Sequence, residues 1–130
     1  MPNYRLITPI DLRPQPDKYE RAVARLCAEK FQSDILFVKR GISTTPDIQV
    51  VATGQFWEIK NIQGKGRHMI ENNLRKASKQ STNVIVSLLK NPKITAQQAE
   101  SRIRYVLRTS NIQLKHVKLV SRSGAMIDIK

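Results

Sequence analysis

The stretch DIQVVATGQFWEIK, residues 47–60, decides the fold of this chain. It holds two short apolar runs that break at Thr53-Gly54, and this pattern predicts a β-hairpin. Farther along, residues 83–89 (NVIVSLL) are almost all apolar and do not alternate with polar residues. Such a run is typical of a strand that is covered on both faces. The hairpin and this strand together predict a mixed sheet with helices on both sides.

Capping residues and apolar periodicity place the other elements around the hairpin. A D-x-x-E capping box starts a helix at Asp17, and a T-x-x-Q box starts another at Thr95. We predict helices over residues 17–31, 67–80 and 95–108, and strands over residues 35–38, 47–52, 55–62, 83–89, 114–120 and 125–129. The order α-β-β-β-α-β, then α-β-β, predicts the α/β class with a mixed α+β sheet.

The length of 130 residues allows one domain with a modest core. We assign residues 17–130 to that domain. Residues 1–16 contain four prolines and no periodicity, so we expect a lead-in segment with a short extended piece. Cys27 is the single cysteine and lies at helical spacing from Val23 and Phe31, so we expect it in the core rather than as a nucleophile.

The net charge is +13, from 23 Lys and Arg against ten Asp and Glu. Residues 60–93 hold eight Lys or Arg and one acid, and residues 102–122 hold six and no acid. This excess favours polyanionic partners, with nucleic acid the commonest. No long apolar stretch or lipid-binding helix is evident, so we expect no membrane partner. The aromatic content of 5% argues against recognition by base stacking and for backbone readout.

The register of the hairpin decides which polar side chains meet. If Thr53-Gly54 is a two-residue turn, Asp47 pairs with Lys60 and Gln49 pairs with Glu58. The pleat then places all four side chains on one face. A three-residue loop would separate Asp47 from Glu58 and Lys60.

Two carboxylates and an ammonium on one face are what a metal-dependent phosphodiesterase needs. We predict Asp47 and Glu58 as ligands of a divalent metal, Mg²⁺ or alternatively Mn²⁺ or Zn²⁺, and Lys60 as the group that orients or polarises the attacking water. Glu20 lies beside the apolar face of the first helix and could look toward the sheet. Its competing role is the capping box with Asp17.

The basic loop and helix after the hairpin could follow a phosphate backbone. We predict nucleic-acid contacts from Lys65, Arg67, His68, Arg75, Lys76 and Lys79. His68 and His116 are the two histidines of the chain. Together they would support an alternative, metal-free cleavage of RNA by general acid–base chemistry.

Four segments carry a resemblance to a known family. They are the E-x-A-x-x-x-L run from Glu20 to Leu26, Pro46-Asp47, Glu58-Ile59-Lys60, and the run IENNLRKASKQS over residues 70–81. The first three resemble the PD-(D/E)XK nuclease superfamily, with its restriction-endonuclease-like α-β-β-β-α-β core. From Pro46 to Lys130 the chain resembles the C-terminal tRNase toxin domain of contact-dependent growth inhibition (CdiA) proteins.

This resemblance implies a toxin that is secreted or delivered from a cell surface and cleaves tRNA in the cytoplasm of a target bacterium. It implies Asp47, Glu58 and Lys60 as the active-site core, with Glu20 a looser match. Its implied partners are tRNA, a cognate acidic immunity protein and a host translation factor. A DNA nuclease of the Holliday-junction-resolvase type and a non-catalytic nucleic-acid-binding module stay open as alternatives.

Overall fold

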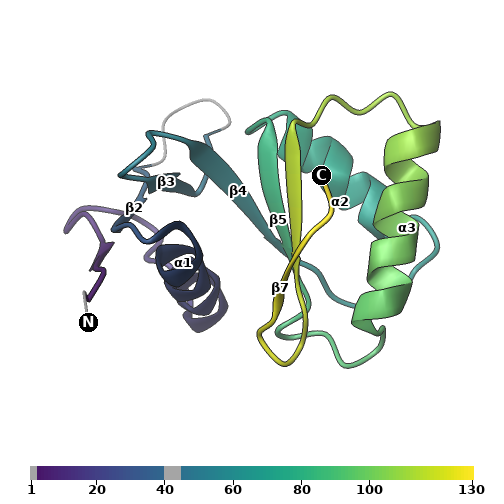
Figure 1. Ribbon diagram of the computed structural model, residues 1–130, viewed down its shortest axis with the longest axis horizontal. Coiled ribbons are helices and arrows are strands. Elements are labelled where there is room, and N and C mark those ends of the chain that lie inside the picture. Colours follow the sequence, from purple (N-terminus) through teal and green to yellow (C-terminus); the bar gives the residue numbers. More distant parts are fainter. Residues whose placement is uncertain (1–2, 40–44) are drawn as a thin grey trace.

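The computed structural model describes residues 3–39 and 45–130, and every structural statement below concerns these residues. Within them lie three helices and seven strands (Figure 1). The helices are α1 (Lys18–Phe31), α2 (Met69–Ser78) and α3 (Ala96–Thr109). The strands are β1 (Leu6–Ile7), β2 (Ile35–Phe37), β3 (Ile48–Val50), β4 (Phe56–Asn61), β5 (Asn83–Ser87), β6 (His116–Val120) and β7 (Met126–Asp128). From α1 onward this is the predicted order of elements.

The strands form one mixed sheet in the order β1-β2-β3-β4-β5-β6-β7. β2, β3 and β4 pair antiparallel as a meander. β4, β5 and β6 pair parallel, with α2 and α3 as the crossover helices between them. β1 adds a parallel edge and β7 an antiparallel one. The predicted mixed sheet is therefore confirmed, and β4 joins its antiparallel and parallel halves.

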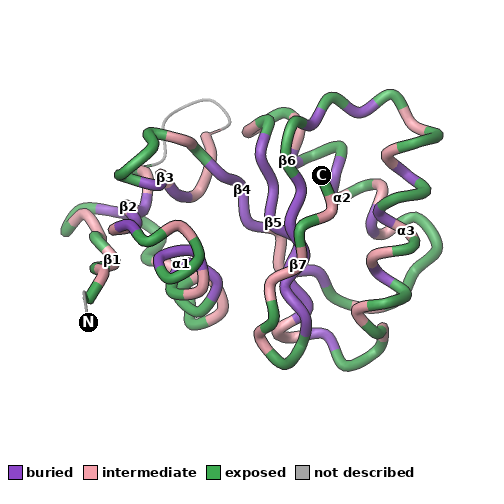
Figure 2. The backbone as a smooth tube through the Cα atoms, viewed as in Figure 1, coloured by how far each residue is buried: buried purple, intermediate pink, exposed green. Residues whose placement is uncertain are grey.

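Each face of the sheet has its own core. α1 covers the β2–β4 half of one face, and α2 and α3 cover the other face (Figure 1). The strands between these layers are the most continuously buried part of the chain (Figure 2). In β4, Trp57 and Ile59 belong to the α1 core, whereas Ile62, which follows the strand, belongs to the α2–α3 core. Glu58 and Lys60 share the parity of Ile62 and therefore project toward α2.

The predicted two-residue turn at Thr53-Gly54 is wrong. The Val50 N–H donates to the Gln55 carbonyl at 2.8 Å, so the loop has four residues, 51–54. Gly54 has φ 78°, a left-handed conformation that glycine adopts without steric cost.

The longer loop moves the register by two residues. Gln49 is opposite Phe56 rather than Glu58, and by continuation Asp47 is opposite Glu58 rather than Lys60. A shift of two residues keeps every side chain on its face of the sheet, because the pleat has a period of two. The predicted side of Asp47, Glu58 and Lys60 is thus right although their pairing is wrong.

Local sequence signals set the helix starts. Asp17 accepts from the Glu20 N–H at 2.8 Å and Thr95 accepts from the Gln98 N–H at 3.1 Å, so both predicted capping boxes are present. α2 begins at Met69, two residues later than predicted, and its N-cap His68 makes no side-chain capping bond. The predicted lead-in segment contributes β1 and the buried Leu12. None of the helices in the described ranges is long and apolar enough to cross a membrane.

Leu74 tests the core between α2 and the sheet. Its side chain is fully buried. Leu74→Ala should lower the free energy of unfolding by about 2–5 kcal/mol, because it removes buried methyl groups and leaves a cavity. Lys76→Ala, at an exposed position of the same helix, should change it by less than about 0.5 kcal/mol. Urea denaturation of both variants checks this, and equal effects would contradict the described orientation of α2.

Candidate active site

A backbone hydrogen bond fixes the Asp47 carboxylate against β4. The Ile59 N–H donates to Asp47 Oδ2 at 2.8 Å. The Asp47 N–H in turn donates to the Trp57 carbonyl at 3.1 Å. Held at both its backbone and its side chain, Asp47 lies beside Glu58, the residue between these two partners on β4.

The Glu58 carboxyl is buried beside a second carboxylate. The residue is only 2% exposed. Burial raises the pKa of Glu58 to about 8, with Asp47 raising it further and the Lys60 ammonium opposing the rise. Two carboxyls this close share a hydrogen bond only when one of them holds a proton. Glu58 Oε1 accepts no hydrogen bond from a donor among the residues that the structure describes.

Lys60 completes the cluster from the same face of β4. Its Nζ lies 3.1 Å from Glu58 Oε2 and donates to Gln80 Oε1 at 2.9 Å. Its side chain is 19% exposed, so the ammonium lies at the edge of the buried pair rather than in open solvent. Gln80 lies two residues beyond the end of α2, after the C-cap Lys79, and had not been predicted as a site residue. The structure therefore brings together Asp47, Glu58, Lys60 and Gln80.

The cluster fits a divalent cation on chemical grounds. Asp47 and Glu58 offer hard oxygen ligands. The buried Glu58 Oε1 has no hydrogen-bond donor among the described residues, and a cation would supply the missing partner. A bound cation would also offset the repulsion from Asp47, which adds to the effect of burial on the Glu58 pKa. No group of three or more His, Cys, Asp and Glu side chains suited to a metal occurs within residues 3–39 and 45–130. Mg²⁺ commonly uses one or two carboxylates with water and substrate phosphates, so two are sufficient.

Glu20 belongs to α1, which lies on the opposite face of the sheet from the Glu58 and Lys60 side chains. It forms the capping box of α1, in line with the buried Ala24 and Cys27 of that helix. The neighbouring Arg21 guanidinium sits 5.8 Å from the Phe37 ring, at the end of β2 that leads toward Asp47 in the sheet. α1 packs on the face opposite to Glu58 and Lys60. The catalytic assignment of Glu20 stays a prediction.

The structure contradicts a catalytic pair of His68 and His116. His116 begins β6 and its ring lies 6.2 Å from the Trp57 ring, on the α1 side of the sheet. His68 precedes α2 on the other side, beyond the opposite end of β4. The six residues of β4 alone span about 20 Å. The sequence could not show this, because it does not state which face each histidine occupies.

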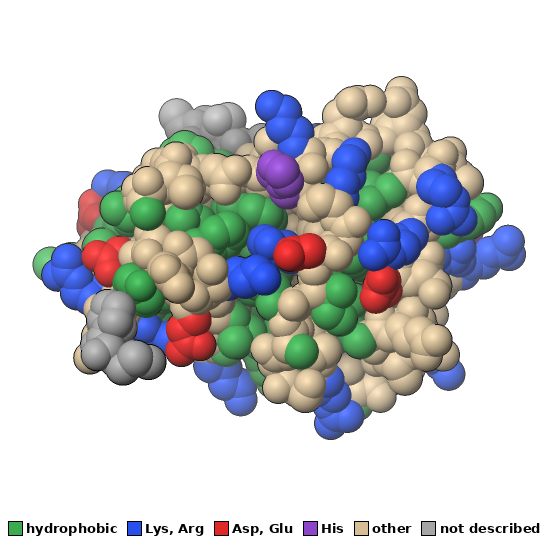
Figure 3. Space-filling model, in the orientation of Figure 1, with side chains coloured by type: hydrophobic (Ala, Val, Ile, Leu, Met, Phe, Trp, Pro, Cys, Tyr) green, Lys and Arg blue, Asp and Glu red, His purple; other side chains and the backbone are tan. Residues whose placement is uncertain are grey.

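The predicted nucleic-acid contacts lie in the loop before α2, within α2 and at its C-cap. Lys65, Arg67, His68, Arg75, Lys76 and Lys79 are all exposed. Arg75 is paired with Glu71 at 3.0 Å, whereas Lys65 and Arg67 line a cavity that also includes Lys93, Gln98 and Arg102. These last three had not been predicted. In Figure 3, Lys and Arg side chains outnumber Asp and Glu on the right of the view, where α3 lies.

Comparisons with known proteins give a matching family model and a similar fold. The family model of the contact-dependent growth inhibition CdiA C-terminal domain matches residues 44–126. The fold resembles a chain of the CdiA-CT/CdiI toxin and immunity complex from Burkholderia pseudomallei, with a TM-score of 0.64 and 19% sequence identity. That likeness covers 98% of this chain and 99% of the other. None of the functionally curated proteins matches the chain.

The raised pKa of Glu58 has a measurable consequence for stability. Its folded pKa of about 8 exceeds the ordinary value of 4.5, so between these values the unfolded chain releases a proton that the folded chain retains. The contribution of Glu58 to stability is therefore complete below pH 4.5 and is lost as pH rises toward 8. In chelator, Glu58→Gln should become more stable relative to the parent from pH 5 to pH 8, then level off. Urea denaturation across this range checks it, and a pH-independent difference would contradict the buried pair.

Proposed function

We propose that this chain, which belongs to the contact-dependent growth inhibition CdiA C-terminal domain family, is a metal-dependent endoribonuclease that cleaves tRNA in a competing bacterium. The observation that carries the chemistry is the buried cluster of Asp47, Glu58 and Lys60, with Glu58 at 2% exposure. Burial of an ionisable carboxyl costs desolvation free energy, so stability alone does not account for Glu58 at this position. Strongly perturbed carboxyls of this kind concentrate at functional sites.

Each side chain has a distinct role in the proposed hydrolysis. Asp47 and Glu58 would hold the metal, which when bound acts as a Lewis acid toward the phosphodiester. Lys60 donates hydrogen bonds, orients the attacking water and stabilises the negative charge that develops on the phosphoryl oxygens. Gln80 holds the Lys60 ammonium in place. Water forms the new P–O bond, the bond to the leaving oxygen breaks, and the proton of the water passes to solvent or to the leaving oxygen.

The choice of tRNA is supported by the resemblance of residues 70–81 to tRNase toxin domains and by the positive surface over α2 and α3. Backbone contacts from Lys and Arg supply sequence-independent affinity for RNA. A DNA nuclease of the junction-resolving type would use the same cluster. The substrate test therefore needs branched and duplex DNA beside tRNA.

The structural neighbour is described as a toxin and immunity complex, and by extension we propose a cognate immunity protein for this chain. A net charge of +13 favours an acidic partner. Delivery from a cell surface into the target-cell cytoplasm belongs to the same proposal. Recruitment of a host translation factor stays a prediction.

Cleavage assays test the proposed chemistry. The purified protein should cleave tRNA with Mg²⁺ or Mn²⁺ and stop in excess chelator, with branched and duplex DNA left intact. Asp47→Asn, Glu58→Gln and Lys60→Met should each lower the rate by about 10²- to 10³-fold, because each removes a group that acts on the developing charge or its metal. Gel analysis of end-labelled tRNA measures these rates.

Matched variants separate the site from general effects of charge. Glu100→Gln removes a carboxylate that pairs with Arg104 on the surface of α3, and Lys115→Met removes an exposed ammonium. Both should keep the parental rate within about twofold. Mg²⁺ should also raise the melting temperature of the parent and not that of Glu58→Gln. Activity that survives both chelator and Glu58→Gln would exclude the metal mechanism.

Growth of a bacterial host tests the biological role. Induced expression of the parent should arrest growth, whereas expression of Glu58→Gln should not. Co-expression of an immunity gene from the same locus should restore growth, because a bound acidic partner would block the basic surface or the cluster. Colony counts and intact tRNA on gels provide the readout. Harmless accumulation of folded parent protein would contradict the toxin role.

A further inference from the structure

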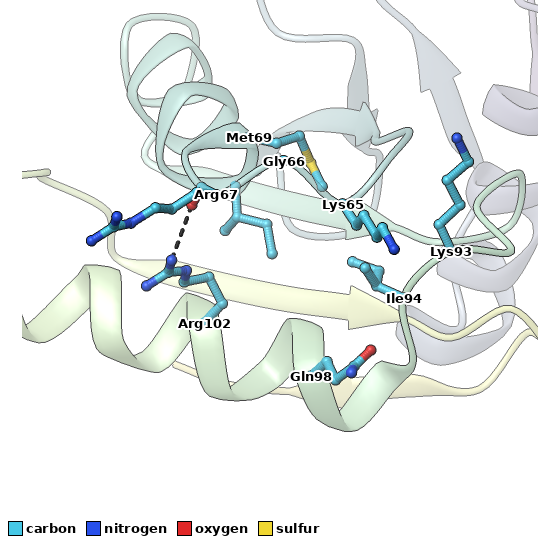
Figure 4. Close-up of a pocket in the computed structure, with 9 residues that line it drawn as sticks. Lys65, Gly66, Arg67, Met69, Lys93, Ile94, Gln98 and Arg102 are labelled. Atoms are coloured by element: carbon cyan, nitrogen blue, oxygen red, sulfur yellow. Dashed lines mark hydrogen bonds between the residues drawn. The ribbon is translucent and has the colours of Figure 1, made fainter.

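A cavity of about 360 Å³ lies between the loop that follows β4 and the first turns of α3. Figure 4 shows its lining residues. Arg67 and Arg102 point the same way at one end, and Lys65 and Gln98 lie at the other end with Lys93 beyond them. Its volume is within the range of about 300–1,000 Å³ that is usual for small-molecule sites. It is larger than a single ion needs.

Three hydrogen bonds fix the segments that line this cavity relative to one another. The side chain of Asn91 is fully buried; its Nδ2 donates to the Gly64 carbonyl at 2.8 Å and its Oδ1 accepts from the Lys93 N–H at 2.9 Å. Asn91 thereby ties the loop that carries Lys65 to the segment that carries Lys93. Across the cavity, Arg102 Nη2 donates to the Arg67 carbonyl at 3.0 Å (Figure 4). The cationic groups are thus mounted on a preformed frame, which lowers the entropy lost on binding.

The polar groups that line the cavity are hydrogen-bond donors. Lys65, Arg67, Lys93 and Arg102 are cations, and no Asp or Glu is among the described lining residues. Gln98 Oε1 already accepts from the Thr95 N–H at 2.9 Å, which leaves its amide nitrogen as the group to donate. A lining rich in donors and cations selects a ligand rich in acceptors, and a phosphodiester with its sugar and base is such a ligand.

The cavity also has an apolar wall and an adjoining aromatic ring. Met69, Ile70 and Ile94 form the wall. A shallow depression along α3 shares Gln98 and Arg102 with the cavity and reaches the exposed Tyr105. The guanidiniums of Arg102 and Arg108 lie 5.5 and 6.0 Å from the Tyr105 ring centre. Phosphate-binding donors beside an apolar wall and an aromatic ring suit a nucleotide whose base is unpaired.

We infer that this cavity is a subsite for one unpaired nucleotide of the RNA substrate, with the neighbouring base against Tyr105. The inference rests on the proposed function and extends it to a part of the surface remote from the cleaved bond. The cavity adjoins the start of α2, whereas Gln80 and the catalytic Lys60 are at its other end. The ten residues of α2 span about 15 Å. The subsite would therefore position the RNA rather than take part in bond cleavage.

Binding measurements in the cleavage-deficient Glu58→Gln background test this subsite. The probes are tRNA, a short single-stranded RNA and a blunt duplex RNA. Adding Lys65→Gln with Lys93→Gln should lower the affinity for tRNA and for single-stranded RNA by about tenfold near 0.15 M salt. The salt dependence of binding should fall by an amount equal to roughly two phosphate contacts. Affinity for the blunt duplex should change by less than about twofold, because a paired base cannot enter the cavity. Tyr105→Ala should weaken the single-stranded probe by about fivefold or more.

The matched control is Lys18→Gln with Lys115→Gln, which removes the same charge from exposed positions outside the cavity. This control should bind all three probes within about twofold of the parent. In the cleaving protein, the cavity variant should raise KM for tRNA. Thermal melting verifies that both double variants are folded.

Four results would overturn the inference. If the cavity variant binds the single strand as the control does, the cavity is not a subsite, although tRNA cleavage by the parent would leave the proposed function intact. If the affinity for the duplex falls as much as the affinity for the single strand, the surface is a general contact for the phosphate backbone. If RNA binding is kept and affinity for the immunity protein is lost, the cavity belongs to the immunity interface. A parent that neither binds nor cleaves tRNA would overturn the proposed function, and the inference with it.

Discussion

The hydrogen bond from the Ile59 N–H to the Asp47 carboxylate is the constraint on which the candidate site depends. Ile48 and Gln49 of β3 are opposite Trp57 and Phe56 of β4, and the Asp47 N–H bond to the Trp57 carbonyl comes at the end of this ladder. There the Asp47 side chain, in place of a backbone carbonyl, accepts the hydrogen bond from the Ile59 N–H of β4. This single bond orders the carboxylate and places it beside Glu58, because adjacent residues of β4 carry the donor and the second carboxyl. β4 is also the strand that joins the two halves of the sheet, so the site is built on its most constrained element.

The hairpin shows what local sequence patterns can and cannot specify. Alternation of apolar residues correctly predicted both strands and the face that each side chain occupies. The register was wrong because contacts from a distant segment shape the loop. The Val51 N–H donates to the Asp34 carbonyl at 3.1 Å, and the Ala52 N–H donates to Ser33 Oγ at 2.9 Å. These bonds hold Val51 and Ala52 in the loop, although the β-branched Val51 favours a strand. The site survived the error because the shift was an even number of residues.

The distinction between local patterns and distant contacts also applies to the candidate functional residues. Asp47, Glu58 and Lys60 come from one hairpin, so a period of two was sufficient to bring them together. Gln80, Lys93 and Arg102 come from separate elements, and only the packing of α2 and α3 on the sheet makes them neighbours of predicted residues. The acid-free stretch from residue 102 to residue 122 was the one sequence signal for Arg102. The predicted catalytic pair of His68 and His116 was wrong because packing places these two residues on opposite sides of the sheet, although their chemistry is suitable.

The distribution of ion pairs argues that the two parts of the proposed RNA surface have different tasks. Several cations are matched by acids: Arg75 by Glu71, Arg104 by Glu100 and Lys118 by Asp128. Such pairs add little attraction for a polyanion, because the neighbouring carboxylate cancels the field. No carboxylate is among the described residues that line the cavity, so the charge of its cations would act outward on a ligand. Lys60 instead faces the buried Glu58, where its charge would act on the proposed reacting centre. Affinity would thus come from the cavity end of α2 and chemistry from the Gln80 end, and the helix sets the distance between them.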